Sequence, residues 1–89
     1  MELNITIEVW QRENWFVAKC PELDFVSQGD TRSAARNNLL EVIQIQFQEM
    51  RDLDTLDDYL AECGFAKGTD AFIPQTEMVG LEKHIVQVA

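Results

Sequence analysis

Apolar and polar residues alternate along the start of the chain, from residue 2 to residue 10. The apolar positions of this stretch are Leu3, Ile5, Ile7 and Val9. A period of two with β-branched residues predicts a strand that buries one face. Polar residues 11–14 then predict a hairpin loop, and residues 15–20 and 25–28 predict two further strands. Because Pro21 has no N–H for a ladder, it ends the second strand. The pattern therefore predicts a three-stranded antiparallel meander.

The apolar spacing changes to steps of three and four after the third predicted strand. The positions in this second pattern are Ala35, Leu39, Val42, Ile43, Phe47 and Met50. They form the apolar stripe of a helix, predicted over residues 32–51 with Thr31 as its N-cap. A shorter helix is predicted over residues 55–63, and Asp54 or Thr55 is placed to cap it.

The last third of the chain reads as an irregular segment and a final strand. Turn-forming residues in the segment 64–77 are Gly64, Gly68, Asp70 and Pro74. They predict irregular structure, and Gly64 is placed to take the left-handed conformation after the short helix. The apolar stretch from Leu81 to Val88 predicts a last strand. The order β-β-β-α-α-β predicts one α+β domain over residues 1–89, with both helices on one face of the sheet.

Two short motifs surround the turn between the second and third predicted strands. They are WFVAKCPEL at Trp15–Leu23 and VSQGDT at Val26–Thr31, directly before the long helix. With these motifs at this spacing, the chain resembles the HicB family of bacterial antitoxins. The likeness covers residues 2 to about 50, and beyond them only the order of elements agrees. The resemblance implies a truncated ribonuclease-H-like fold with a β-β-β-α core, followed here by a short helix and a C-terminal strand.

The resemblance also implies a partner. Members of the HicB family bind and neutralise a small basic HicA toxin, a ribonuclease that cleaves mRNA. This chain would then act as an antitoxin by protein–protein occlusion. Many members add a C-terminal DNA-binding domain, but residues 51–89 leave too little chain for one, so direct DNA binding is not expected. An interaction or ligand-binding module of the same fold without a toxin remains the alternative, since a fold does not determine a function.

The charge of the chain favours a basic partner. Sixteen acidic and seven basic residues give a net charge of −9. Such a surface repels phosphate backbones and anionic lipids, and it speeds encounter with a cationic protein. The competing interpretation is that the acidity only maintains solubility. No apolar run approaches the roughly 20 residues that span a bilayer, and the N-terminus lacks the pattern of a signal peptide, so a cytoplasmic protein is expected.

The residues that could carry chemistry are few and scattered. No trio of carboxylates converges in the predicted fold, so a two-metal nuclease site is not expected. His84 is the only histidine, and Cys20 and Cys63 are not spaced to join it as zinc ligands. His84 is instead expected to be packed or half-exposed in the last strand. The two cysteines are expected to be free thiols, with a single disulfide as the alternative. No catalytic, cofactor or metal residue is therefore predicted, and no enzyme.

Two features are candidates for a protein interface. Residues 49–62 hold six acids, Glu49, Asp52, Asp54, Asp57, Asp58 and Glu62. They predict a surface that meets the basic toxin, although a charge run is often only a solvated helix face. Trp10 and Trp15 are the second candidate, because both are expected on the outer face of the sheet with Val17 and Lys19. The alternative is that the tryptophan rings pack against the C-terminal segment.

Self-association is expected as well. A short sheet has open edge strands, and the predicted C-terminal strand could pair with its twin across a two-fold axis. The sequence predicts a homodimer or a tetramer without choosing between them.

Overall fold

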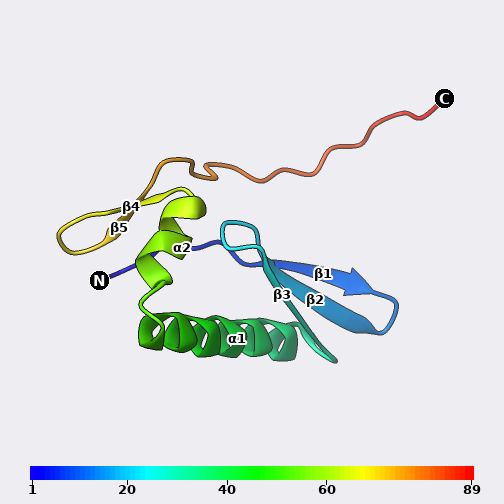
Figure 1. Ribbon diagram of the computed structural model, residues 1–89. Helices are drawn as coiled ribbons and strands as arrows, with labels where there is room; N and C mark the ends of the chain where they lie inside the picture. Colours follow the sequence, from blue (N-terminus) through cyan, green and yellow to red (C-terminus); the bar gives the residue numbers. More distant parts are fainter.

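The computed structural model describes residues 1–89 as a small α+β fold with two antiparallel sheets and two helices. The larger sheet consists of β1 (Glu8–Arg12), β2 (Trp15–Cys20) and β3 (Phe25–Gly29), in that order (Figure 1). Both neighbouring pairs are antiparallel, so β2 is the central strand. The predicted three-stranded meander is confirmed.

The first strand is shorter than the alternation predicted. It begins at Glu8, which pairs with Lys19, and not at residue 2. The physical reason lies in the neighbouring strand, because β2 ends at Cys20 and Pro21 follows. In this register Ile7 would face Cys20 and Thr6 would face Pro21, which has no N–H to donate. The prediction of a strand over residues 2–10 is therefore wrong for residues 2–7.

The N-terminal segment before β1 pairs with another part of the chain. Glu2 forms a parallel bridge with Ala71. The Glu2 N–H donates to the carbonyl of Asp70 at 3.0 Å, and the Phe72 N–H donates to the carbonyl of Glu2 at 2.8 Å. The alternating apolar residues still pack against the core, and they are Leu3, Ile5 and Ile7. The alternation thus predicted which side is buried, and it did not predict the hydrogen-bond partner.

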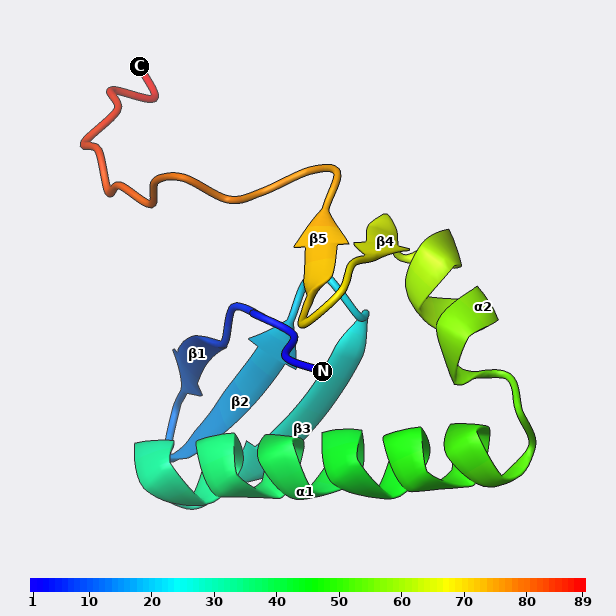
Figure 2. The same ribbon diagram turned by 90° about the vertical axis from the view of Figure 1, so that its left-hand side faces the viewer.

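The long helix α1 (Arg32–Asp52) covers one face of the larger sheet (Figure 2), as the predicted range 32–51 indicated. Thr31 is its N-cap, and the hydroxyl oxygen accepts from the N–H of Ala34 at 3.0 Å. The helix packs through a stripe that joins the core of the molecule. The fully or nearly fully buried core residues are Ala18, Cys20, Leu23, Ala35, Leu39, Ile43, Leu60 and Phe65.

The short helix α2 (Leu56–Glu62) follows the predicted range of 55–63 closely. It contacts α1 and β4, and its Tyr59 ring stacks on Phe25 of β3. The expectation of two helices on one face therefore holds fully for α1, while α2 reaches that face only at its edge strand. No side chain caps α2. Thr55 occupies the N-cap position, but its hydroxyl donates to the carbonyl of Met50 at 3.4 Å. Thr55, one of the two predicted caps, is therefore the N-cap residue by position, but its side chain does not cap the helix.

A second hairpin occupies the segment that was predicted to be irregular. It consists of β4 (Phe65–Lys67) and β5 (Phe72–Pro74), paired antiparallel. The Gly68 N–H donates to the carbonyl of Ala71 at 2.9 Å and closes the turn between them. Gly68 and Asp70 therefore mark a hairpin turn within regular structure. Gly64, at the end of α2, has a φ of +93°, as expected.

The predicted last strand from Leu81 to Val88 is not part of any sheet. No backbone–backbone hydrogen bond involves a residue after Gln75. We call residues 78–89 the C-terminal arm. It leaves the second hairpin as an extended segment, and its end lies well away from the sheets and helices (Figures 1 and 2). The apolar pattern is typical of a strand, but a strand needs a neighbour.

Neither helix combines the length and the apolar character that crossing a membrane requires.

Candidate protein-binding surface

The six acids of residues 49–62 lie along the last turn of α1, the corner after it and the short helix α2. We call this set the acidic surface; its members, all exposed, are Glu49, Asp52, Asp54, Asp57, Asp58 and Glu62. Local backbone geometry makes the corner. The N–H of Leu53 donates to the carbonyl of Glu49 at 3.0 Å as α1 ends. Asp54 then takes a left-handed φ of 58°, which an aspartate tolerates better than most residues, and the chain turns into α2.

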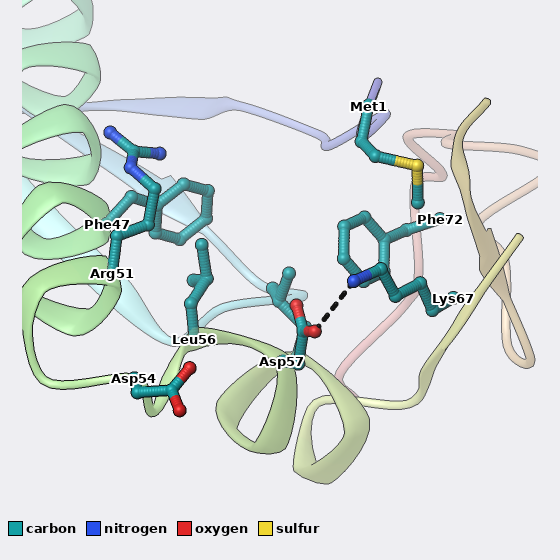
Figure 3. A pocket seen from close by; sticks show the side chains of 9 residues that line it. Met1, Phe47, Arg51, Asp54, Leu56, Asp57, Lys67 and Phe72 are labelled. Carbon is teal, nitrogen blue, oxygen red and sulfur yellow. Dashed lines mark hydrogen bonds and ion pairs between the residues drawn. The ribbon is translucent and has the colours of Figure 1, made fainter. Parts of the chain in front are cut away.

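Most charges of the acidic surface have no cationic partner. Its only ion pair joins the Asp57 carboxylate to Lys67 Nζ at 2.9 Å (Figure 3). Both side chains of this pair are exposed, so it stabilises the fold little. Asp52 accepts a hydrogen bond from the Gln48 amide at 3.0 Å. The Arg51 guanidinium donates to the side-chain amide oxygen of Gln48 at 2.9 Å and not to a carboxylate. The acidic surface therefore carries five carboxylates without an ion pair.

Two of the acids stand where the helices themselves disfavour them. Asp52 is the last residue of α1 and Glu62 is the last residue of α2. The C-terminal end of a helix carries a partial negative charge, so an acid there destabilises the helix by a few tenths of a kcal/mol up to about 1 kcal/mol. Asp57 and Asp58, in the first turn of α2, are placed favourably. The helix dipoles do not account for the acids at Asp52 and Glu62.

A hollow of about 380 Å³ opens beside the acidic surface (Figure 3). Its apolar lining comes from both helices, the second hairpin and the N-terminus, and consists of Met1, Phe47, Leu56, Leu60 and Phe72. Asp54, Asp57, Arg51 and Lys67 provide the charged groups of the lining. Such a hollow can receive an apolar side chain, or the aliphatic stem of a basic one, next to fixed charges. Sequence reasoning missed it, because its residues come from four separate segments.

Tyr59 fixes α2, and with it the acidic surface, to the rest of the fold. Its hydroxyl donates to the carbonyl of Leu23 at 2.6 Å, and its ring stacks on Phe25 with centroids 6.0 Å apart. Burial of the phenol, assisted by the neighbouring Cys63 thiol, raises the pKa of Tyr59 to about 12. The neutral hydroxyl is therefore the form that holds α2 against the turn after β2.

The two tryptophans lie elsewhere, on the face of the larger sheet that α1 does not cover. Trp10 stands opposite Val17, and Trp15 precedes Val17 by two residues, so all three share that face. Trp10 is 55% exposed and Trp15 is half-buried. Lys19 Nζ lies 5.7 Å from the centroid of the Trp10 ring. The ring N–H of Trp10 donates to the Glu8 carboxylate at 3.0 Å.

This arrangement corrects the outer-face prediction in one detail. Val17 does share the face of Trp10 and Lys19, but it is only 7% exposed and not open to solvent. It lies in the central strand, flanked by Trp10 on one side and by Gln28 on the other. Since α1 covers the opposite face of the sheet, the structure does not bring Trp10 and Trp15 together with the acidic surface.

The remaining reactive groups are separate from one another. No three histidine, cysteine, aspartate or glutamate side chains lie close enough to hold a metal ion. Cys20 and Cys63 are both unpaired. Burial raises the pKa of Cys20 to about 11, and the Glu22 carboxylate, 3.6 Å from its sulfur, acts in the same direction. His84 is exposed in the C-terminal arm beside Glu82, so the expectation of a packed or half-exposed histidine is wrong.

A comparison of the chain with known protein families, curated proteins and solved structures finds no match.

Proposed function

We propose that this chain is an antitoxin of the HicB type, which binds a small basic mRNA-cleaving toxin and blocks it by occlusion. The observation that carries the proposal is the acidic surface. All six of its carboxylates are exposed, and only that of Asp57 forms an ion pair. Two of them, Asp52 and Glu62, end helices whose dipoles disfavour them. Acids at positions that the helix dipoles disfavour are consistent with selection for a cationic partner.

The order of elements supports the same proposal. The WFVAKCPEL motif forms β2 and the turn after it, and the VSQGDT motif spans most of β3 and the N-cap of α1. Residues 8–52 thus follow the β-β-β-α order that the HicB resemblance implies. The proposal therefore includes the truncated ribonuclease-H-like fold that the resemblance implies, and it includes a cytoplasmic location.

The proposed mechanism is competition for a cationic surface. A ribonuclease binds its substrate through lysines and arginines that contact phosphates. Carboxylates held on two adjoining helices can take the place of those phosphates, and the potential of a chain with a net charge of −9 speeds the encounter. The 380 Å³ hollow would then receive a side chain of the toxin beside the charged contacts. Binding alone inhibits, and this chain breaks no bond.

Charge reversal at the two disfavoured positions tests the proposal. The variant Asp52→Lys/Glu62→Lys changes the charge by +4 and places cations where both helix dipoles favour them, so the fold should be retained. Glu13→Lys/Glu41→Lys changes the charge equally at exposed positions outside the acidic surface, and it is the matched control. The candidate partner is the product of the adjacent gene, which the proposal requires to be a small basic protein, and its association rate is measured across a salt series.

The first variant should associate at least about tenfold more slowly than the control at low salt, with a flatter salt dependence. Equal rates for the two variants would show that the acidic surface does not steer the partner. Failure of the unmodified chain to bind the basic protein would contradict the antitoxin proposal itself and favour an interaction module without a toxin.

A further inference from the structure

The C-terminal arm exposes apolar side chains to an unusual degree. Val79, Ile85 and Val88 are 92%, 95% and 100% exposed. The radius of gyration is 15.5 Å, against about 12 Å for a compact domain of 89 residues. Both views show why, because the arm runs outward from the second hairpin and its end touches no other element (Figures 1 and 2). An extended apolar segment in water normally has something to cover it.

The larger sheet has a free edge strand, β1, to which an extended segment can pair. β1 pairs with β2 on one side and with no strand on the other, so alternate backbone N–H and C=O groups of its outer edge have no partner. A hollow of about 720 Å³ lies along this edge, lined by residues 7–11 and by Leu81–Lys83 at the beginning of the arm. The edge therefore has open space beside it, and it lies close to where the arm begins.

We propose that the C-terminal arm of one chain adds as a fourth strand to the free edge of β1 in a second copy, and that the exchange is reciprocal. Backbone hydrogen bonds would align the arm with β1 of the second copy. The apolar side chains of the arm would cover the apolar residues beside that strand. This inference does not rest on the proposed antitoxin function.

The area available is sufficient for a stable dimer. Burying a valine, leucine or isoleucine removes roughly 60–120 Å² of apolar surface from water. The arm has five such residues with high exposure, Val79, Leu81, Ile85, Val86 and Val88. Two arms and the surfaces that they cover would bury about 1,200–2,400 Å², and stable interfaces bury about 1,200–2,000 Å².

Charge also favours the arm as the contact between copies. Each chain has a net charge of −9, so two copies repel one another over most of their surfaces. Residues 79–89 contain one acid, Glu82, and one base, Lys83, and their net charge is zero with His84 neutral. The arm is thus a neutral, apolar part of an otherwise acidic protein, and it can approach a second copy without that repulsion.

Sedimentation velocity over a concentration series tests the exchange with the full chain. In the variant Ile85→Pro/Val86→Pro, successive prolines remove one N–H from each side of the arm, so one of them must lie in the proposed ladder. The control Leu53→Ser removes an exposed apolar side chain from the corner between the helices. Wild type and control should be dimers, and the double proline variant should need at least tenfold higher concentration to dimerise.

Hydrogen exchange of the unmodified chain separates exchange between copies from folding of the arm onto its own β1. In the proposed dimer, the amides of residues 79–89 exchange at least about tenfold more slowly at concentrations where the dimer forms than in the monomer. Protection that is equal at all concentrations would mean that the arm pairs within its own chain. No protection at any concentration, or a proline variant that dimerises like wild type, would also overturn the proposal.

Discussion

Tyr59→Phe is the substitution that most sharply tests how the acidic surface is held in place. It removes one oxygen and leaves the ring, so the stacking on Phe25 remains. What is lost is the 2.6 Å hydrogen bond from the phenol to the carbonyl of Leu23. This bond joins α2 to the turn after β2, across 36 positions of sequence. The variant therefore measures one tertiary contact with little change in packing.

The expected effect follows from the burial of the acceptor. The Leu23 side chain is completely buried, so water replaces the lost donor at its carbonyl poorly. A net hydrogen bond contributes about 0.5–1.5 kcal/mol, and a buried acceptor without a partner costs about 1–3 kcal/mol. Since the Tyr59 side chain is only half-buried, we expect a loss of about 1–2 kcal/mol in the free energy of unfolding. For a domain of this size, that lowers Tm by roughly 5–15 °C.

Urea unfolding at pH 7 and thermal unfolding measure the change. Thr55→Val is the matched control, because it deletes a hydroxyl whose hydrogen bond is exposed and 3.4 Å long, and it should change stability by less than about 0.5 kcal/mol. The pH dependence gives a second check. The Tyr59 pKa is raised from 10.0 to about 12 in the folded state, so its stabilisation is complete below pH 10 and falls as the pH rises towards 12. Tyr59→Phe should lack that fall.

Two results would refute this reasoning. One is a Tyr59→Phe protein as stable as wild type, which would mean that α2 is held by other contacts. The other is an equal loss in Thr55→Val, which would mean that removal of any hydroxyl near α2 has the same effect. In either case the rigidity of the acidic surface would need another explanation.

Two further substitutions test other contacts of the fold. Glu22→Gln should lower stability at pH 7 by about 1 kcal/mol. Burial alone would raise the pKa of the Glu22 carboxyl. The hydroxyl and N–H of Thr6 donate hydrogen bonds to this carboxylate at 2.6 and 2.9 Å, and these bonds outweigh burial and lower the pKa below 4.5. This stabilisation is present above pH 4.5 and lost as the pH falls below it, so unfolding curves of variant and wild type should converge in acid. Gly29→Ala should cost about 1–3 kcal/mol, because a Cβ there would lie 2.6 Å from the backbone nitrogen of Ala35, whereas Gly80→Ala, in open space, should be neutral in the same thermal unfolding assay.

Local patterns predicted the elements whose partners lie nearby in the sequence. The 3.6-residue periodicity located α1 to within one residue, and the Thr31 hydroxyl does cap it. The meander follows from short hairpin loops, which leave few alternatives for pairing consecutive strands. In each case the information lies within about twenty residues, so the sequence alone is sufficient.

Pairing over longer distances could not be predicted in this way. Glu2 bonds with Phe72 at the other end of the chain, and no local pattern in either segment indicates the other. The second hairpin has strands of only three residues, too short to show a period of two against the turn residues around them. The segment from Leu81 to Val88 shows strand composition but has no neighbour in the chain. Composition indicates a preference for extended backbone, and pairing depends on which edge is within reach.

The same limit applies to the candidate site. The acids from Glu49 to Glu62 were visible as a run in the sequence, and the structure leaves all six exposed along the end of α1, the corner and α2. Their lack of cationic partners could not be predicted, because Lys67, which reaches Asp57, comes from the second hairpin. The hollow beside them could not be predicted either, since its lining joins Phe47 on α1 to Phe72 on β5.

The most direct test of the central claim is a cleavage assay. The product of the adjacent gene is incubated with RNA while the unmodified chain is added in increasing amounts, and complex formation is followed in the same samples. The proposal predicts that cleavage stops as the complex forms, and that more of the Asp52→Lys/Glu62→Lys variant than of the unmodified chain is needed to stop it. Cleavage that continues at a saturating concentration of the unmodified chain would contradict the proposal. So would an adjacent gene product that neither cleaves RNA nor binds this chain.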